Sequence, residues 1–180
     1  MNINNDRSFL ALDIVKMTAE YARQISHWKY DKPYSLYNHS ESSVAELMDG
    51  EHFACLTTGG ELAGYLSFGK DARIPTVEED VYDDGFLDIG IGLRPDICGR
   101  GYGLSFLQCG LAFAKTHYGI RRFRLSVASF NERAIKVYAR AGFVLMREVT
   151  HAKFPMKFLI KILRYAQDDS VGLGASVGLS

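Results

Sequence analysis

The first half of the chain alternates between the two-residue period of strands and the three-to-four-residue period of helices. These patterns predict, in chain order, a strand, a helix, a loop, a short helix and two more strands, over residues 9 to 16, 18 to 28, 29 to 40, 42 to 49, 52 to 58 and 62 to 69. Thr18 is suited to cap the first helix, because its side-chain oxygen can accept a hydrogen bond from a free backbone amide. Gly59 and Gly60 separate the last two strands, which indicates an antiparallel hairpin with a left-handed backbone available to both glycines.

The second half has a stronger alternation of strands and helices. Residues 70 to 85 are too polar and too acidic for a core element. A strand, a helix, a strand, a helix and two strands are then predicted, over residues 86 to 93, 102 to 118, 122 to 129, 131 to 141, 143 to 149 and 156 to 163. Gly119 and Gly142 end the two helices. The expected fold is therefore a mixed α/β domain over residues 1 to 164, followed by a small, polar appendage over residues 165 to 180.

Composition and charge limit the class of protein but do not indicate an activity. The 180 residues are 47% hydrophobic, enough for one core. The formal net charge is zero, so no global field favours nucleic acid or an anionic membrane as a partner. No stretch resembles a leader or a membrane span, and the three widely spaced cysteines favour a reduced, cytoplasmic protein without a metal site. The oligomeric state stays open, and a homodimer is one option.

The most specific local feature is a glycine-rich turn between a predicted strand and a predicted helix. Gly99, Gly101 and Gly103 let backbone amides approach a ligand, and the following helix adds free amides and the positive end of its dipole. Such a turn suits a pyrophosphate. A dinucleotide-binding turn would need glycine where Phe106 stands, and the Gly-Lys-Ser/Thr run of a Walker loop is absent. The alternative is a turn that only packs the helix on the strand.

Two motifs, separated by a helix and a strand, resemble those of a known family. The first is Leu93-Arg94-Pro95 followed by Cys98-Gly99-Arg100-Gly101-Tyr102-Gly103, and the second is NERAIKVYARAGFV over residues 131 to 144. Both resemble the GNAT superfamily of acyl-CoA-dependent N-acyltransferases, whose first motif reads Gln/Arg-x-x-Gly-x-Gly/Ala. Cys98 occupies the first motif position, which removes one side-chain contact but leaves the amides intact. The resemblance covers residues 8 to 163, and within the family it is nearest the bacterial ribosomal-protein-acetylating branch.

The resemblance implies a GNAT-like central mixed and twisted sheet of about seven strands, flanked by helices, with acetyl-CoA as acyl donor. It also implies which residues bind this cosubstrate. The pyrophosphate would lie on the amides of Gly99, Arg100, Gly101, Tyr102, Gly103 and Leu104. The pantetheine arm and thioester would lie along the backbone of Ile91, Gly92 and Leu93, where the fourth and fifth strands separate. Gly90 and Gly92 would suit a β-bulge there, or would merely relieve close packing.

Three residues are candidates for the chemistry. Tyr138 lies seven residues after Asn131, so both share one helix face. By resemblance, Tyr138 would protonate the CoA thiolate, since a phenol with a free pKa near ~10 keeps its proton at neutral pH, and Asn131 would contact the pantetheine. The alternatives are a core tyrosine and a helix cap. Asp88 could deprotonate the amine directly or through water, or could be a solvent-exposed carboxylate at a strand end.

The acceptor side is expected in the aromatic loop after the first helix. Its candidate residues are Trp28, Tyr30, Tyr34 and Tyr37. They would form the wall of an amine-binding groove, or they would anchor the loop to the core. The acidic residues between positions 78 and 84 could attract a cationic amine, although a solvated loop is the usual role of such a run.

Together these features predict an N-acetyltransferase that moves an acetyl group from acetyl-CoA directly to a primary amine of a small molecule or peptide, without a metal. Two alternatives remain open. One is a catalytically silent acyl-CoA-binding or sensing module, and the other is a general binder of nucleotide phosphates.

Overall fold

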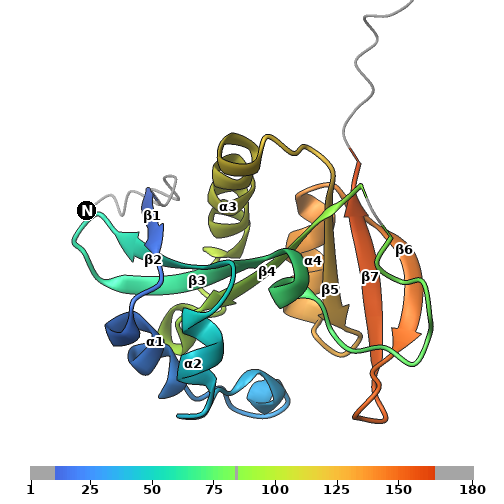
Figure 1. Cartoon of the computed structure of the whole chain (residues 1–180), viewed down its shortest axis with the longest axis horizontal. Helices are drawn as coiled ribbons and strands as arrows, with labels where there is room; N and C mark the ends of the chain where they lie inside the picture. The colour runs from blue at the N-terminus through green and yellow to red at the C-terminus, as the bar shows by residue number, and fades with distance from the viewer. Residues whose placement is uncertain (1–10, 84, 165–180) are drawn as a thin grey trace, which may run out of the picture.

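The computed structural model describes residues 11 to 83 and 85 to 164, which form a seven-stranded sheet with helices on both faces (Figure 1). The strands are β1 (Leu12–Lys16), β2 (His52–Thr57), β3 (Leu62–Phe68), β4 (Leu87–Leu93), β5 (Phe123–Ala128), β6 (Phe143–Thr150) and β7 (Lys157–Leu163). The α-helices are α1 (Ala19–Ser26), α2 (Ser43–Met48), α3 (Gly103–Tyr118) and α4 (Glu132–Arg140). Three short 3-10 helices are η1 (Tyr34–Tyr37), η2 (Gly69–Ala72) and η3 (Pro95–Ile97).

The sheet is mixed and twisted, as predicted. Its strand order is β1-β2-β3-β4-β5-β7-β6, and every neighbouring pair is antiparallel except β4 and β5. Figure 1 shows β5, β7 and β6 turned steeply against the plane of β2 to β4. In the parts of the chain that are described, no helix is both long and apolar enough to cross a bilayer. The appendage expected over residues 165 to 180 lies outside the described residues.

Local signals in the sequence account for most element boundaries. The side chain of Thr18 accepts a hydrogen bond from the Tyr21 amide, which confirms the predicted cap of α1. Gly119 ends α3 in the left-handed conformation, with φ of 67°. The hairpin between β2 and β3 forms as expected, but only Gly60 adopts a positive φ, so the turn uses one of the two glycines in this way.

The strands β2 and β3 are buried on both faces. Phe53 and Cys55 of β2 face a core shared with α3, whereas Ala54 between them faces a second core beneath α1 and α2. This alternation follows from the two-residue period of a strand. In Figure 1, α3 lies on one side of the sheet and α1 and α2 on the other. The helices cover both faces of the strands that build the site.

β4 and β5 are paired only at the beginning of β4. The parallel register joins Leu87 to Phe123 and Asp88 to Arg124, and no further partners follow. The remainder of β4 stays paired with β3 on its other side, from Ile89 to Leu93. The sheet is therefore open between β4 and β5 beyond Asp88, as the resemblance implied.

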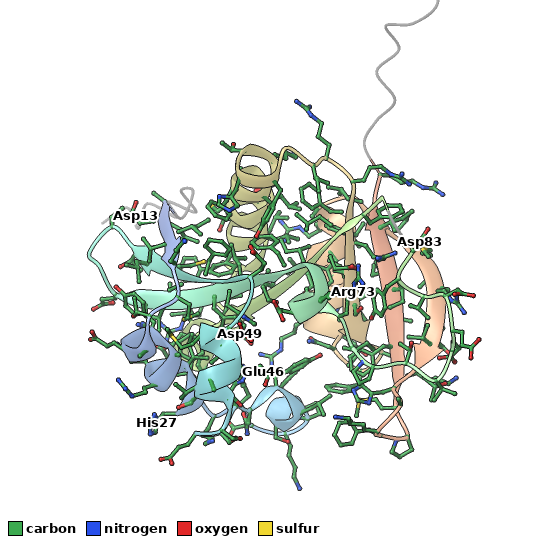
Figure 2. The ribbon with its side chains drawn as sticks, viewed as in Figure 1. Asp13, His27, Glu46, Asp49, Arg73 and Asp83 are labelled. Carbon is green, nitrogen blue, oxygen red and sulfur yellow. The ribbon has the colours of Figure 1, made fainter. Side chains whose placement is uncertain are left out.

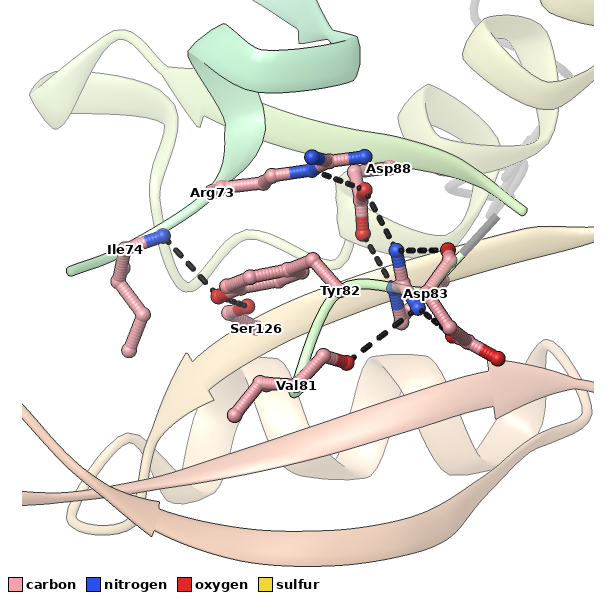
Figure 3. A network of polar contacts seen from close by, with 8 residues as sticks. Arg73, Ile74, Val81, Tyr82, Asp83, Asp88 and Ser126 are labelled. Atoms are coloured by element: carbon pink, nitrogen blue, oxygen red, sulfur yellow. Dashed lines mark hydrogen bonds and ion pairs between the residues drawn. The ribbon is translucent and has the colours of Figure 1, made fainter. Parts of the chain in front are cut away.

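A buried ion-pair network lies where this opening begins (Figure 3). The guanidinium of Arg124 donates to Asp88 from Nε at 2.6 Å and from Nη2 at 2.9 Å. The Arg73 Nε donates to the same carboxylate at 2.7 Å. Arg124 is 0% exposed and Asp88 is 1% exposed, so neither charge has water to compensate it. Each charge depends on its partner.

The segment before β4 is attached to this network. Arg124 also donates from Nη1 to the Asp83 carboxylate at 2.5 Å and from Nη2 to the Asp83 carbonyl at 3.3 Å. The Tyr82 hydroxyl accepts from the Ile74 amide at 3.1 Å and shares a hydrogen bond with Ser126 at 2.9 Å. The described residues 70 to 83 and 85 contain no strand, but Tyr82 and Asp83 connect this segment to the buried network.

We expect Asp88→Asn to lower the free energy of unfolding by about 3 to 5 kcal/mol, because it removes the buried partner of Arg124 and leaves this guanidinium with only the exposed Asp83 carboxylate. Urea denaturation measures the change. Asp96→Asn is the matched control, since its exposed pair with Arg94 has the same 2.6 Å spacing, and its midpoint should hardly move. Equal midpoints for the two variants would show that the buried pair is not a structural requirement.

Candidate active site

A pocket of about 680 Å³ occupies the opening between β4 and β5. Its walls come from β4, β5, the glycine-rich turn before α3, one face of α4 and the aromatic loop after α1. Segments far apart in the sequence therefore meet here because the sheet is open.

The glycine-rich turn presents free backbone amides. Gly99 and Gly101 both have positive φ, 76° and 91°, a conformation that strains any residue with a Cβ. No hydrogen bond within the described chain is donated by the amides of residues 99 to 104. A Cβ placed at Gly101 would meet no atom within 4 Å, so the turn has open space beside this residue. The turn at the start of α3 thus has the donors that a pyrophosphate requires.

The two glycines of β4 serve close packing and form no β-bulge. The register between β3 and β4 is continuous, so the expected bulge at Gly90 and Gly92 is wrong. A Cβ at Gly92 would lie 2.1 Å from the ring of Tyr65, and one at Gly90 would lie 2.4 Å from the Ser67 hydroxyl. The side chains of Tyr65 and Ser67 on β3 thus reach across β4 toward the pocket. A residue with a Cβ at position 90 or 92 would clash with them.

Ile91, Gly92 and Leu93 line the pocket, as expected. Their edge of β4 faces the opening, because β5 has separated from it. The carbonyl of Leu93 already accepts a hydrogen bond from the Tyr30 hydroxyl at 2.7 Å. That carbonyl therefore fixes the aromatic loop against β4.

Tyr138 and Asn131 lie on one face of α4, and both line the pocket. Tyr138 is 7% exposed, and burial raises its pKa well above the usual value, with smaller contributions from Tyr37 and Tyr65. Within the described residues its hydroxyl has no hydrogen-bond partner, yet it is not a fully buried polar atom. It therefore faces the pocket with its proton retained.

Asn131 has two structural roles. Its side-chain oxygen caps α4 by accepting from the Ala134 amide at 3.1 Å, and its Nδ2 donates to the Tyr37 hydroxyl at 3.2 Å. The cap interpretation is thus confirmed, and the second bond connects α4 to the aromatic loop.

The aromatic loop both lines the pocket and packs against the core. Tyr30, Tyr34 and Tyr37 line the pocket, and the rings of Tyr34 and Tyr37 lie 6.0 and 6.4 Å from that of Phe130. Trp28 does not line the pocket. It packs near Tyr65, with ring centroids 6.3 Å apart, in the core beneath α1 and α2.

Asp88, Arg100 and Tyr102 also lie outside the pocket lining. The Asp88 carboxylate is paired with two guanidinium groups and is buried, so the alternative of a solvent-exposed carboxylate is wrong. Arg100 and Tyr102 are exposed, and only their backbone belongs to the turn.

Sequence reasoning missed Tyr65, His39 and Arg133. Tyr65 lines the pocket, and its hydroxyl lies 2.9 Å from Nε2 of His39. The guanidinium carbon of Arg133 lies 3.9 Å from the centre of the Tyr34 ring. A Cβ at Gly99 would be 3.5 Å from Nη1 of the same arginine. Arg133 thus connects the aromatic loop to the glycine-rich turn, a role that no sequence motif signals.

The charged side chains that line the pocket are mostly basic. Asp31 is the one acidic residue among the described residues lining it, and the basic residues are Lys29, Lys32, Arg133, Lys136 and Arg140. This balance suits an anionic ligand. No group of three or more potential metal ligands gathers anywhere in residues 11 to 83 and 85 to 164.

Comparisons with solved structures support the fold. A chimera of the spermidine N-acetyltransferase SpeG from Vibrio cholerae and hSSAT aligns with a TM-score of 0.66 at 17% identity, over 84% of this chain and 94% of that one. A GNAT-family acetyltransferase from Bacillus anthracis aligns with a TM-score of 0.65 at 15% identity, over 84% and 93%. At such identities the likeness concerns the fold alone.

Sequence comparison identifies the family. No curated protein sequence matches this chain significantly. The model of the acetyltransferase (GNAT) family, however, matches residues 16 to 143, which include the glycine-rich turn, all of α4 and the pocket wall of β4. The chain belongs to the acetyltransferase (GNAT) family.

Proposed function

We propose that this protein transfers an acetyl group from acetyl-CoA directly to a primary amine. The observation that carries the proposal is the meeting of three features in one pocket: the free amides of residues 99 to 104, the unpaired edge of β4 and the Tyr138 hydroxyl. Acetyl-CoA, when bound, supplies an acetyl group activated as a thioester. An anion site, a slot for an extended chain and a proton donor are the parts that this transfer requires.

The residues present fit the cosubstrate. The amides of residues 99 to 104 would bind the pyrophosphate, and the side chain of Leu104 lines the same pocket. The backbone of Ile91 to Leu93 would hold the pantetheine and orient the thioester, with Asn131 on the facing helix. Tyr138 would hold the proton that the departing thiolate needs, and its raised pKa keeps that proton in place at neutral pH.

Tyr30, Tyr34 and Tyr37 would form the acceptor wall of the pocket. Six solved neighbours in this fold are named as forms of the spermidine N-acetyltransferase SpeG or its chimeras with hSSAT. The pocket of this protein carries five basic side chains and one carboxylate, which disfavours a polycation. We therefore expect an amine of low positive charge as acceptor, and the resemblance to the ribosomal-protein-acetylating branch would make a peptide amine one such acceptor.

A screen for acetyl-CoA-dependent thiol release tests the function. The panel comprises spermidine, an aminoglycoside, amino acids and short peptides with free N-termini. We expect turnover, with spermidine among the weaker acceptors. Tight acetyl-CoA binding without turnover of any amine would instead support the silent acyl-CoA-binding module.

The cosubstrate site can be tested at Gly101. We expect Gly101→Asp to weaken acetyl-CoA binding at least tenfold in calorimetry, because a negative charge enters the anion site. Gly60→Asp is the matched control, since Gly60 also has a positive φ, 80°, with no atom near its Cβ position, but lies in the hairpin between β2 and β3. Equal affinity in the two variants would exclude the turn as the anion site.

The proposed general acid can be tested by removing one hydroxyl. Tyr138→Phe keeps the ring against Phe143, 6.1 Å away, so stability and acetyl-CoA affinity should change little. We expect kcat to fall by about tenfold to a thousandfold, the effect of a lost proton donor that water partly replaces. Tyr21→Phe on α1, outside the pocket, is the control. Undiminished kcat with chemistry rate-limiting would exclude Tyr138 as the acid.

A further inference from the structure

The proposed transfer leaves one proton without a protein acceptor. A primary amine is largely protonated at neutral pH and must lose a proton before it can attack a thioester. Asp88 cannot serve, because two guanidinium groups hold its buried carboxylate outside the pocket. Asp31, the one carboxylate among the described residues lining the pocket, is exposed in the loop after α1. The proton must leave by another route.

Tyr65 and His39 form a contact that offers such a route. Tyr65 lines the pocket, and its ring lies against Gly92 of β4, next to the backbone proposed to hold the thioester. Its hydroxyl lies 2.9 Å from Nε2 of His39, with the two rings edge to face at 5.6 Å. The histidine itself lies behind the tyrosine and does not line the pocket. Only Tyr65 separates the pocket from a group that can accept a proton.

The surroundings of His39 keep it neutral and fixed. Burial lowers the pKa of His39, Glu46 on α2 raises it in part, and His52 at the start of β2 and Lys29 lower it further. Figure 2 shows Glu46 on α2, beside the loop that carries His39. Lys29 donates a hydrogen bond from Nζ to the His39 carbonyl at 3.1 Å, which holds the loop in place. A neutral imidazole can accept a proton at Nε2.

We propose that Tyr65 and His39 together accept the proton of the acceptor amine, an inference that rests on the proposed acetyl transfer. The ammonium nitrogen gives one proton to the Tyr65 oxygen, while the Tyr65 hydroxyl passes its own proton to Nε2 of His39. Tyr65 ends as a phenol, His39 ends as an imidazolium, and the half-buried His39 releases its proton to water. Tyr65 is the catalytic residue, and His39 acts through it.

The proposed proton route through Tyr65 and His39 has a different task from the proposed general acid, Tyr138. Burial raises the pKa of Tyr65 to about 12, so it transfers a proton only in concert with His39. Tyr65 and Tyr138 both line the pocket, so both residues belong to one site. Of the two protons that the nitrogen loses overall, one leaves through His39. The other passes to the Tyr138 oxygen and replaces the proton that Tyr138 gives to the thiolate.

Two amines of similar size and very different basicity provide the test. Ethylamine is protonated at neutral pH, whereas 2,2,2-trifluoroethylamine is mostly neutral there. The variants are Tyr65→Phe, which keeps the ring against Gly92, and His39→Gln, which keeps a hydrogen-bond acceptor without a titrating group. We measure kcat/KM by thiol release between neutral pH and the pKa of ethylamine. His27→Gln is the control, because His27 is exposed beside α1, away from the pocket (Figure 2).

With ethylamine at neutral pH, we expect both variants to lose about a hundredfold in kcat/KM. The loss should shrink as the pH approaches the pKa of ethylamine and should nearly vanish with trifluoroethylamine. A loss of the same size for both amines at every pH would assign the pair a structural role and overturn the proposal, as would no loss. If the unmodified protein released no thiol with any amine, the proposed acetyl transfer would be wrong, a result distinct from failure of this route.

Discussion

The ion pair between Asp88 and Arg124 is the constraint on which the rest of this structure depends. Both side chains are almost completely buried, and they belong to the last pair of residues that joins β4 to β5. Separating a buried ion pair costs more free energy than forming the pair contributes, because each charge is then left buried without its partner. Alternative packings that separate Asp88 from Arg124 are therefore disfavoured. Arg73 and Asp83 attach the preceding segment to the same two residues. We infer that the network determines where the sheet stops being continuous.

The site follows from that interruption. Beyond Asp88, the edge of β4 has no strand beside it, and the space is closed by α4 and by the aromatic loop. Arg133 and Asn131 of α4 contact Tyr34 and Tyr37 of that loop, so the wall of the acceptor side is attached to the helix that carries Tyr138. Side-chain contacts therefore connect the parts proposed to bind the acyl donor to those proposed to bind the acceptor. A rigid arrangement of this kind is what catalysis by positioning requires.

The fold, and the pocket position of most residues predicted to bind the cosubstrate, could be predicted from the sequence because local chemistry determines them. Three signals can be interpreted from the few residues around them: the glycines at a strand-to-helix turn, the seven-residue spacing on α4 and the capping threonine. The misassignments involve contacts between distant residues. Asp88 could be placed in a strand, but its partner Arg124 lies 36 residues away. Tyr65 and His39 carry no motif, and their meeting depends on the register of β3 and the path of a loop. Gly90 and Gly92 fitted two explanations until the register showed which side chains approach them.

The most direct test of the account follows the acetyl group itself. Acetyl-CoA labelled with carbon-13 in the acetyl group is incubated with the protein and the amine panel, and mass spectrometry quantifies labelled amide against released CoA thiol. Direct transfer at the opening between β4 and β5 predicts one labelled N-acetyl product for each thiol released. With Tyr138→Phe, labelled product should form only at the residual rate of that variant. Thiol release accompanied by free labelled acetate, with no acetylated amine, would contradict the account.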